Sequence, residues 1–257
     1  MPIFRCYIIG CRNSKRQKKL IYSLSQATLF GRDITFDQFG KYNLRIRKTL
    51  EAVYKHYQGE STDYEFQALG EYLKQVWFAS GIHHHYACDK FIPSFTEQFF
   101  RDAVLSVDKK QLPLRENEDV NELLNELCPV IFDPTIHPKR VNKADGVDLI
   151  CTSACNYYEG VNQQEVENYY AKMKAEGPDS EQPSYGLNST LIKKGNSVRE
   201  DVWKADGKYG AAIKQIIVWL ERAKAFTENE QQHKVISLLI KYYETGDLRD
   251  FDRYRSE

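Results

Sequence analysis

Apolar residues recur at intervals of three and four along most of this chain, and that spacing constrains it to a fold built largely from helices. Ile46, Leu50 and Val53 are one example, because residues three and four apart lie on the same face of a helix. The pattern predicts helices over residues 42–57, 64–78, 95–107, 120–127, 162–174, 209–226 and 229–244. Apolar stripes of this kind are expected to be core.

Residues that favour helix ends flank several of these segments. Ser94 followed by Glu97 predicts a capping box, and Asn162 can cap the helix that starts there. Gly59 and Gly246 follow two other segments, where a left-handed glycine would end a helix. These signals place helix ends within a few residues.

Strand signals gather in the middle of the chain. The β-compatible segments are residues 129–132, 148–152, 190–194 and 197–202. Gly195-Asn196 between the last two predicts a two-residue hairpin turn, and the charged run 175–183 predicts a loop. Helices around a few short strands predict an α+β fold.

Composition excludes several classes of protein. In 257 residues, 36 Lys and Arg balance 36 Asp and Glu, so charge gives no case for nucleic acid or membrane partners. A hydrophobic content of 42% excludes wholesale disorder, and no run approaches the roughly 20 apolar residues of a membrane helix. The basic residues of the amino end follow its apolar run, the reverse of a secretory signal. Six cysteines without a CxxC pair indicate reduced thiols, and we predict a cytoplasmic protein.

Three consecutive histidines, His83, His84 and His85, suggest a metal site, but their spacing argues against one. Adjacent side chains point about 100° apart on a helix and to opposite faces on a strand, so three in a row cannot converge on one ion. Zinc ligands share a face or a turn. The simpler alternatives are a polar loop wall and ring nitrogens bonded to the backbone.

Other candidate chemistry is sparse. The sequence contains no GxSxG nucleophile elbow and no GxxxxGK[ST] or GxGxxG phosphate loop. Tyr157-Tyr158-Glu159-Gly160 could present aromatic rings and a carboxylate to a peptide, although tyrosines packed at a strand end are the preferred interpretation.

Seven segments carry a family resemblance. They are VWFASGIHHHYACDKFIP at residues 76–93 and, in order along the chain, residues 20–54, 128–142, 152–161, 183–195, 202–223 and 236–254. Together they resemble the amino-terminal half of the bacterial branch of the dipeptidyl peptidase III family. Its members are zinc exopeptidases that release dipeptides from the amino end of short peptides. The resemblance begins at about residue 17, so residues 1–16 are an unmatched leader and residues 17–257 the expected lobe.

The resemblance implies a mainly helical lobe around a small five-stranded β-barrel. Some strands of that barrel would come from sequence beyond residue 257, so the barrel is expected to be incomplete. The family's zinc site resembles an HExxGH helix with a later EExxAD-type helix, and this chain has no His-Glu dipeptide. We therefore assign no catalytic residue and no metal ligand here. Zinc is expected only in the full-length family member, and the chain alone is predicted to be inactive.

The resemblance also implies a substrate site. An aromatic residue in the family's corresponding loop lines the pocket for the first two residues of the peptide, and here that residue is Tyr86. His83, His84 and His85 flank it and are the other candidate substrate-binding residues. The expected partners are a short peptide and the missing carboxy-terminal catalytic lobe. The alternative is a stand-alone, non-catalytic α+β module that binds peptides or another protein.

Overall fold

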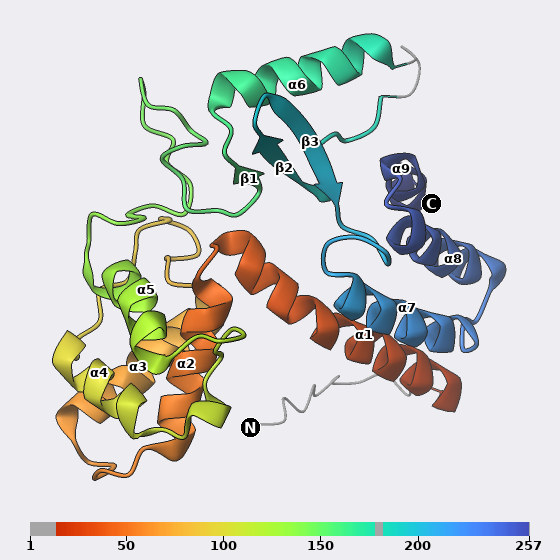
Figure 1. Ribbon diagram of the computed structural model, residues 1–257. Coiled ribbons are helices and arrows are strands. Elements are labelled where there is room, and N and C mark those ends of the chain that lie inside the picture. Colours follow the sequence, from red (N-terminus) through yellow and green to blue (C-terminus); the bar gives the residue numbers. More distant parts are fainter. Residues whose placement is uncertain (1–13, 178–181, 257) are drawn as a thin grey trace. The chain divides into compact units, whose positions relative to one another are not determined.

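Helices dominate the computed structural model, which describes residues 14–177 and 182–256 (Figure 1). The helices are α1 (Lys15–Phe39), α2 (Asn43–His56), α3 (Tyr64–Ala79), α4 (Glu97–Ser106), the 3-10 helix η1 (Lys109–Gln111), α5 (Val120–Phe132), α6 (Gln163–Glu176), α7 (Gly210–Lys224), α8 (Glu230–Thr245) and α9 (Leu248–Ser256). The strands are β1 (Tyr158–Glu159), β2 (Ser189–Lys194) and β3 (Ser197–Val202). The predicted α+β class is confirmed.

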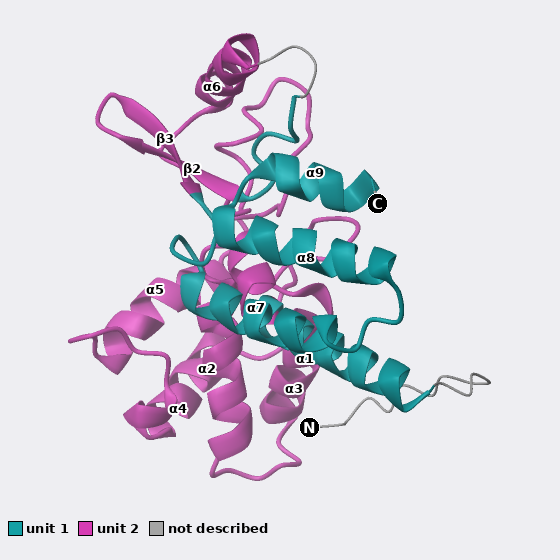
Figure 2. Cartoon of the chain, turned by 90° about the vertical axis from the view of Figure 1, so that its right-hand side faces the viewer, with its two compact units in different colours: residues 1–31, 178–188, 202–257 teal, residues 32–177, 189–201 magenta. Residues whose placement is uncertain are grey.

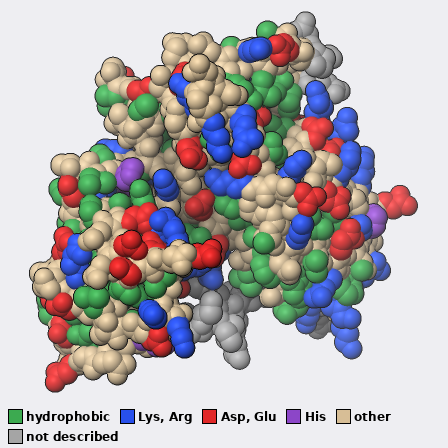
Figure 3. Space-filling view, viewed as in Figure 1, with side chains coloured by type: hydrophobic (Ala, Val, Ile, Leu, Met, Phe, Trp, Pro, Cys, Tyr) green, Lys and Arg blue, Asp and Glu red, His purple; other side chains and the backbone are tan. Residues whose placement is uncertain are grey.

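The chain divides into two compact units (Figure 2). Unit 1 comprises residues 1–31, 178–188 and 202–257, and unit 2 comprises residues 32–177 and 189–201. Within the described ranges, no helix is both long enough and apolar enough to cross a bilayer. Acidic and basic side chains intermingle over the face seen in Figure 3, in keeping with the balanced composition.

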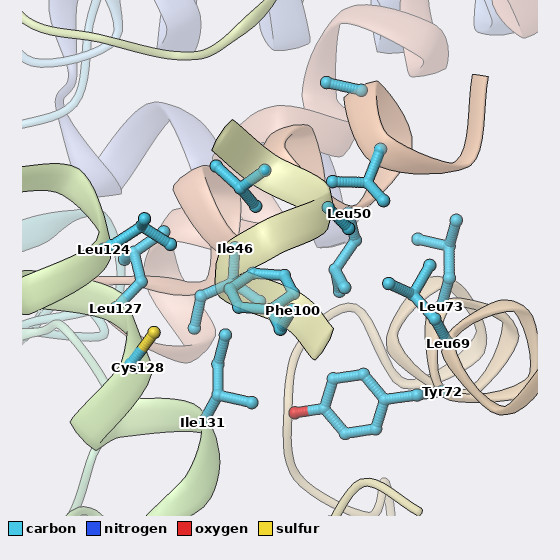
Figure 4. Close-up of a cluster of buried hydrophobic side chains, with 14 of the residues drawn as sticks. Ile46, Leu50, Leu69, Tyr72, Leu73, Phe100, Leu124, Leu127, Cys128 and Ile131 are labelled. Atoms are coloured by element: carbon cyan, nitrogen blue, oxygen red, sulfur yellow. The ribbon is translucent and has the colours of Figure 1, made fainter. Parts of the chain in front are cut away.

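The core of unit 2 is built from the predicted apolar stripes of α2, α3, α4 and α5. Leu50, Leu69, Phe100 and Leu127 come from these four helices, and none has any exposed surface (Figure 4). Burying each such side chain contributes about 1.5–3 kcal/mol. This core is the rigid support for the loops that join the helices.

The helix ends agree with the sequence in some places and correct it in others. Asn162 caps α6 in the predicted way, and Gly246 ends α8 with φ 71°. The cap of α4 is Thr96, which accepts from the backbone N–H of Phe99, so the prediction of Ser94 is wrong. Gly59 is not left-handed, because α2 already ends at His56, and its C-cap Tyr57 has left the helical conformation with φ −58° and ψ 130°.

The predicted strand at residues 129–132 is the last turn of α5. Proline inside a helix costs about 3 kcal/mol, which made a helix end before Pro129 the natural expectation. The apolar stripe nevertheless continues past it, since Cys128 and Ile131 have no exposed surface. Burial of these side chains outweighs the proline penalty.

The predicted strand at residues 148–152 is a turn held by a side chain. One carboxylate oxygen of Asp148 accepts from the backbone N–H groups of Ile150 and Cys151 at 2.9 and 2.8 Å. Such local bonds compete with strand pairing for the same N–H groups. Two α-helices, α1 and α9, and the short 3-10 helix η1 were not predicted at all.

The strands form an open sheet in the order β1-β2-β3. Tyr158 pairs with Leu191 in parallel register, and the predicted Gly195-Asn196 turn joins β2 to β3. The sheet in the described part of the chain is not closed into a barrel. Helix α6 lies along it, with Val166 and Leu191 in a small buried cluster between them (Figure 1).

Unit 1 is a helical layer formed by α7, α8, α9 and the first part of α1. Tyr22 of α1 meets Trp219 of α7 edge-to-face at 5.9 Å, and Tyr242 of α8 packs on Phe251 of α9 at 5.1 Å. The buried Asn188 side chain donates to the Gly246 carbonyl at 2.9 Å, which ties the entry to β2 onto the end of α8.

Candidate functional site

Residues 82–91, which we call the tip loop, leave α3 and return to the core in a closed hairpin-like path within unit 2. The backbone N–H of Phe91 donates to the carbonyl of Ile82 at 2.8 Å, and that of His84 donates to Asp89 at 2.7 Å. These bonds make the base of the loop a short antiparallel bridge. Tyr86 lies at the far end of the loop.

A second segment, residues 136–140, fixes the loop from the side. The backbone N–H of Lys90 donates to Pro138 at 3.1 Å, and the backbone N–H of Arg140 donates to Cys88 at 2.9 Å. The Lys90 ammonium also donates to the carbonyls of Asp133 and Ile136, at the end of α5. The loop is therefore held by backbone bonds on both sides.

The guanidinium of Arg140 reaches the tip itself. Its Nη2 donates to the carbonyl of His85 at 2.9 Å and lies 3.8 Å from the Cys88 sulfur. The same guanidinium covers the ring of Phe39 at 4.5 Å. A planar group that stacks on one side and donates on another holds its partners in a fixed orientation.

Strained backbone gathers around this loop. Ser80, Cys88 and His137 have φ values of 56°, 62° and 50°, in the left-handed region that non-glycine residues rarely adopt. Such residues cost about 1–3 kcal/mol each and persist where the surroundings determine them. Ser80 is the C-cap of α3, and the contacts around Cys88 and His137 determine the path of the loop at the other two positions.

Gly81 is needed because a buried asparagine approaches the backbone. A Cβ at this position would lie 2.3 Å from the Asn43 side-chain nitrogen, closer than any real contact. The oxygen of that same side chain accepts from the Ile82 backbone N–H at 3.3 Å. Asn43 thus fixes the start of the tip loop from the first turn of α2.

His83 points into the protein and has only 2% of its surface exposed. Its Nε2 donates to the carbonyl of His137 at 2.8 Å, while its Nδ1 has no partner among the described residues. Burial lowers the pKa of His83 to about 4; the bond to the carbonyl opposes this shift, and the charges of Lys90 and Arg140 add to it. His83 is therefore a neutral, structural residue at pH 7.

The next two histidines have different partners. His84 Nδ1 accepts from the backbone N–H groups of Tyr86 and Ala87, at 3.3 and 3.1 Å, so its proton lies on Nε2. His85 stacks on His84 with 4.6 Å between ring centres. These separate engagements do not fit a shared zinc ion, and no cluster of three metal-binding side chains was found within the described ranges.

Tyr86 is the most open large side chain of the loop, with 85% of its surface exposed. Its ring lies 4.2 Å from that of His85, which in turn meets Phe78 edge-to-face at 4.9 Å. Phe78, at the end of α3, is 76% exposed and was not identified from the sequence. The only sequence signal that could have pointed to Phe78 was its position at the predicted end of a helix.

Two hollows of about 390 Å³ lie in the described part of the chain, and the tip loop borders neither of them. One hollow is lined in unit 1 by Lys15, Arg16, Lys19, Ala225 and Phe226. The other is lined in unit 2 by Arg115, Glu116, Asn117, Glu118, Glu122 and Glu126. The tip loop and the end of α3 instead form an aromatic surface, in which the half-buried His85 contacts the exposed rings of Phe78 and Tyr86.

Comparison with known proteins gives a structural likeness. No family model matches the chain, and no curated protein matches it in sequence. Among solved structures it is similar to that of DPP III from Caldithrix abyssi, with a TM-score of 0.53 and 16% sequence identity. The match covers 91% of this chain and 32% of that chain, so this chain spans about a third of its length. At this identity the likeness shows a DPP III-like fold.

Proposed function

We propose that this chain is the peptide-binding lobe of a zinc peptidase of the DPP III type, which releases dipeptides from the amino end of short peptides. The observation that carries the proposal is the exposed Tyr86 on a loop fixed by backbone bonds, within a DPP III-like fold. The tip-loop sequence is also the part of the chain with the most specific resemblance to that family.

The chemistry of the exposed aromatic surface suits a varied ligand. Rings such as those of Phe78 and Tyr86 make apolar contacts that do not depend on one side-chain shape. The Tyr86 hydroxyl can in addition bond a peptide group. We assign His84 and His85 to the support of the ring, and His83 to the fold beneath it.

Zinc would supply an activated water in a complete enzyme. The donors of the tip loop do not suit that metal, because the ring nitrogens of His83 and His84 bond backbone groups in different directions. We therefore assign zinc to a catalytic lobe that acts with this one and derive no catalytic step from the present residues.

The test is binding of a fluorescently labelled tetrapeptide to the purified chain. Removal of the ring in Tyr86→Ala is expected to weaken binding about three- to tenfold, in line with the 0.5–1.5 kcal/mol of a stacked aromatic contact. Tyr64→Ala is the matched control, because Tyr64 is a tyrosine of the same unit with 73% of its surface exposed. Equal affinities for the wild type and Tyr86→Ala would refute the assignment of the site.

A further inference from the structure

A carboxylate without a cation lies between α6 and the β2–β3 hairpin. Glu200 of β3 is half-buried, and its Oε1 accepts from the Tyr170 hydroxyl at 3.1 Å and from the Ser189 hydroxyl at 2.7 Å. Ser189 is itself 98% buried, since only 2% of its surface is exposed. Both donors converge on one oxygen, and the other oxygen has no partner among the described residues.

Hydroxyl donors orient this carboxylate but do not neutralise it. Burial and the Glu200 charge both raise the pKa of Tyr170, so its phenol stays protonated and continues to donate at neutral pH. No lysine or arginine of the described residues forms an ion pair with Glu200. Both hydroxyls bond the same oxygen, so half of the hydrogen-bonding capacity of this carboxylate is left for a further donor.

The same seam between helix and hairpin contains a carboxylate that does have its cation. Glu165 lies one turn before Tyr169 on α6 and forms an ion pair with the ammonium of Lys193 from β2. The architecture thus places a lysine ammonium on one of its two carboxylates and leaves the other open. A buried or half-buried charge is stabilised by such a partner and costs free energy without it.

Two tyrosines of α6 lie beside the open carboxylate. The rings of Tyr169 and Tyr170 are perpendicular and 5.4 Å apart, and both tyrosines are half-buried. Tyr158, from the motif that the sequence singled out, packs on the same small cluster under α6. Tyrosine faces attract ammonium groups, and a carboxylate among them adds a full opposite charge.

We infer that Glu200, with Tyr169 and Tyr170, forms a binding site for an alkylammonium group. The site is separate from the tip loop and does not depend on the proposed peptidase function. The ammonium can belong to a lysine side chain or to a free α-amino group, since both present the same chemistry.

The probe is n-butylammonium chloride, titrated into the whole chain at constant ionic strength with n-butanol and sodium chloride as neutral and ionic controls. Saturable chemical-shift changes at Glu200, Tyr169 and Tyr170 are expected for the ammonium alone. Nα-acetyl-lysine amide and alanine amide then identify the source, because the first carries only the side-chain ammonium and the second only the α-ammonium.

Glu200→Gln is the decisive variant, because the amide oxygen still accepts from both hydroxyls while the charge is lost. It is expected to bind n-butylammonium at least tenfold more weakly. Glu159→Gln, an exposed glutamate of β1, is the matched control and should bind as the wild type does. Tyr169→Leu keeps the carboxylate and should weaken binding two- to fivefold, as expected for a lost cation–π contact of 0.5–1 kcal/mol. Absence of saturable shifts in the wild type, or equal affinity in Glu200→Gln, would overturn the inference.

Discussion

The buried His83 should make unit 2 sensitive to mild acid, and the size of the effect follows from its pKa. The group has an ordinary pKa of 6.5 when unfolded and about 4 in the fold. A lowered folded pKa means that the unfolded state takes up the proton first as the pH falls. The contribution of neutral His83 to the free energy of unfolding is therefore fully present above pH 6.5. It declines between pH 6.5 and 4 and is lost below pH 4.

The expected loss is substantial for a single side chain. A difference of about 2.5 pKa units corresponds to roughly 3 kcal/mol when complete, of which about 2 kcal/mol is lost by pH 5. Low pKa values of Asp133, Asp148, Glu118 and Glu165 also lower stability in acid, but at lower pH, and they remain in every variant.

The assay compares the wild type with His83→Gln, whose amide can still donate to the His137 carbonyl but does not titrate. Urea unfolding is followed at pH 7.5 and 5.0 through Trp77 of unit 2, in a background where Trp203 and Trp219 are phenylalanine. Between pH 7.5 and pH 5.0, the free energy of unfolding of the wild type should fall by about 2 kcal/mol more than that of His83→Gln. A difference that stays constant between the two pH values would refute the reasoning and mean that water reaches the His83 ring.

Four further outcomes are expected. Gly81→Ala should lower the free energy of unfolding by roughly 1–3 kcal/mol, because its Cβ collides with Asn43, and the loss should shrink in an Asn43→Ser background; equal losses in both backgrounds would contradict this contact. Arg140→Met should speed hydrogen exchange of the tip-loop amides. Arg140→Lys should have a smaller effect, because only the guanidinium both stacks on Phe39 and donates to His85. Unchanged exchange in both variants would show that Arg140 does not support the loop. The purified chain should not release dipeptides from a dipeptidyl arylamide, with or without added zinc. Metal-dependent release that survives removal of contaminating peptidases would contradict the assignment of zinc to another lobe. In a zinc-containing relative with this loop, Tyr86→Ala should raise KM and leave the zinc content unchanged; the reverse pattern would place the metal at the loop.

The sequence predicts the local parts of this fold well because their causes are local. Helices with continuous apolar stripes, the Asn162 cap and the Gly195-Asn196 turn all depend on residues within a few positions of one another. The failures have causes that a local pattern does not contain. Pro129 stays helical because Cys128 and Ile131 are buried by distant helices, and the turn at Asp148 depends on a side chain that competes for strand hydrogen bonds.

The candidate site was predictable only in outline. The tip-loop sequence singles out Tyr86, whose role in binding stays a prediction. The structure gives His83 and His84 different hydrogen-bond partners, and His85 stacks on His84. The partner of His83 is a carbonyl 54 positions away, and the support from Arg140 crosses a similar distance. Long-range contacts of this kind, and the ring of Phe78 beside His85, are set by tertiary packing and leave no periodic trace in the sequence.

The division of the tip loop into a bonded base and an open end has a consequence for how this protein can change. Its base is specified mainly by backbone hydrogen bonds, which are indifferent to most side chains, and Tyr86 at its end contributes little to the core. Substitutions at the end can therefore be sampled at small cost in stability, whereas changes at Gly81 or His83 cannot. A library randomised at Tyr86 and Ala87 alone would vary the exposed surface on an unchanged scaffold, the same separation that lets antibody loops diversify.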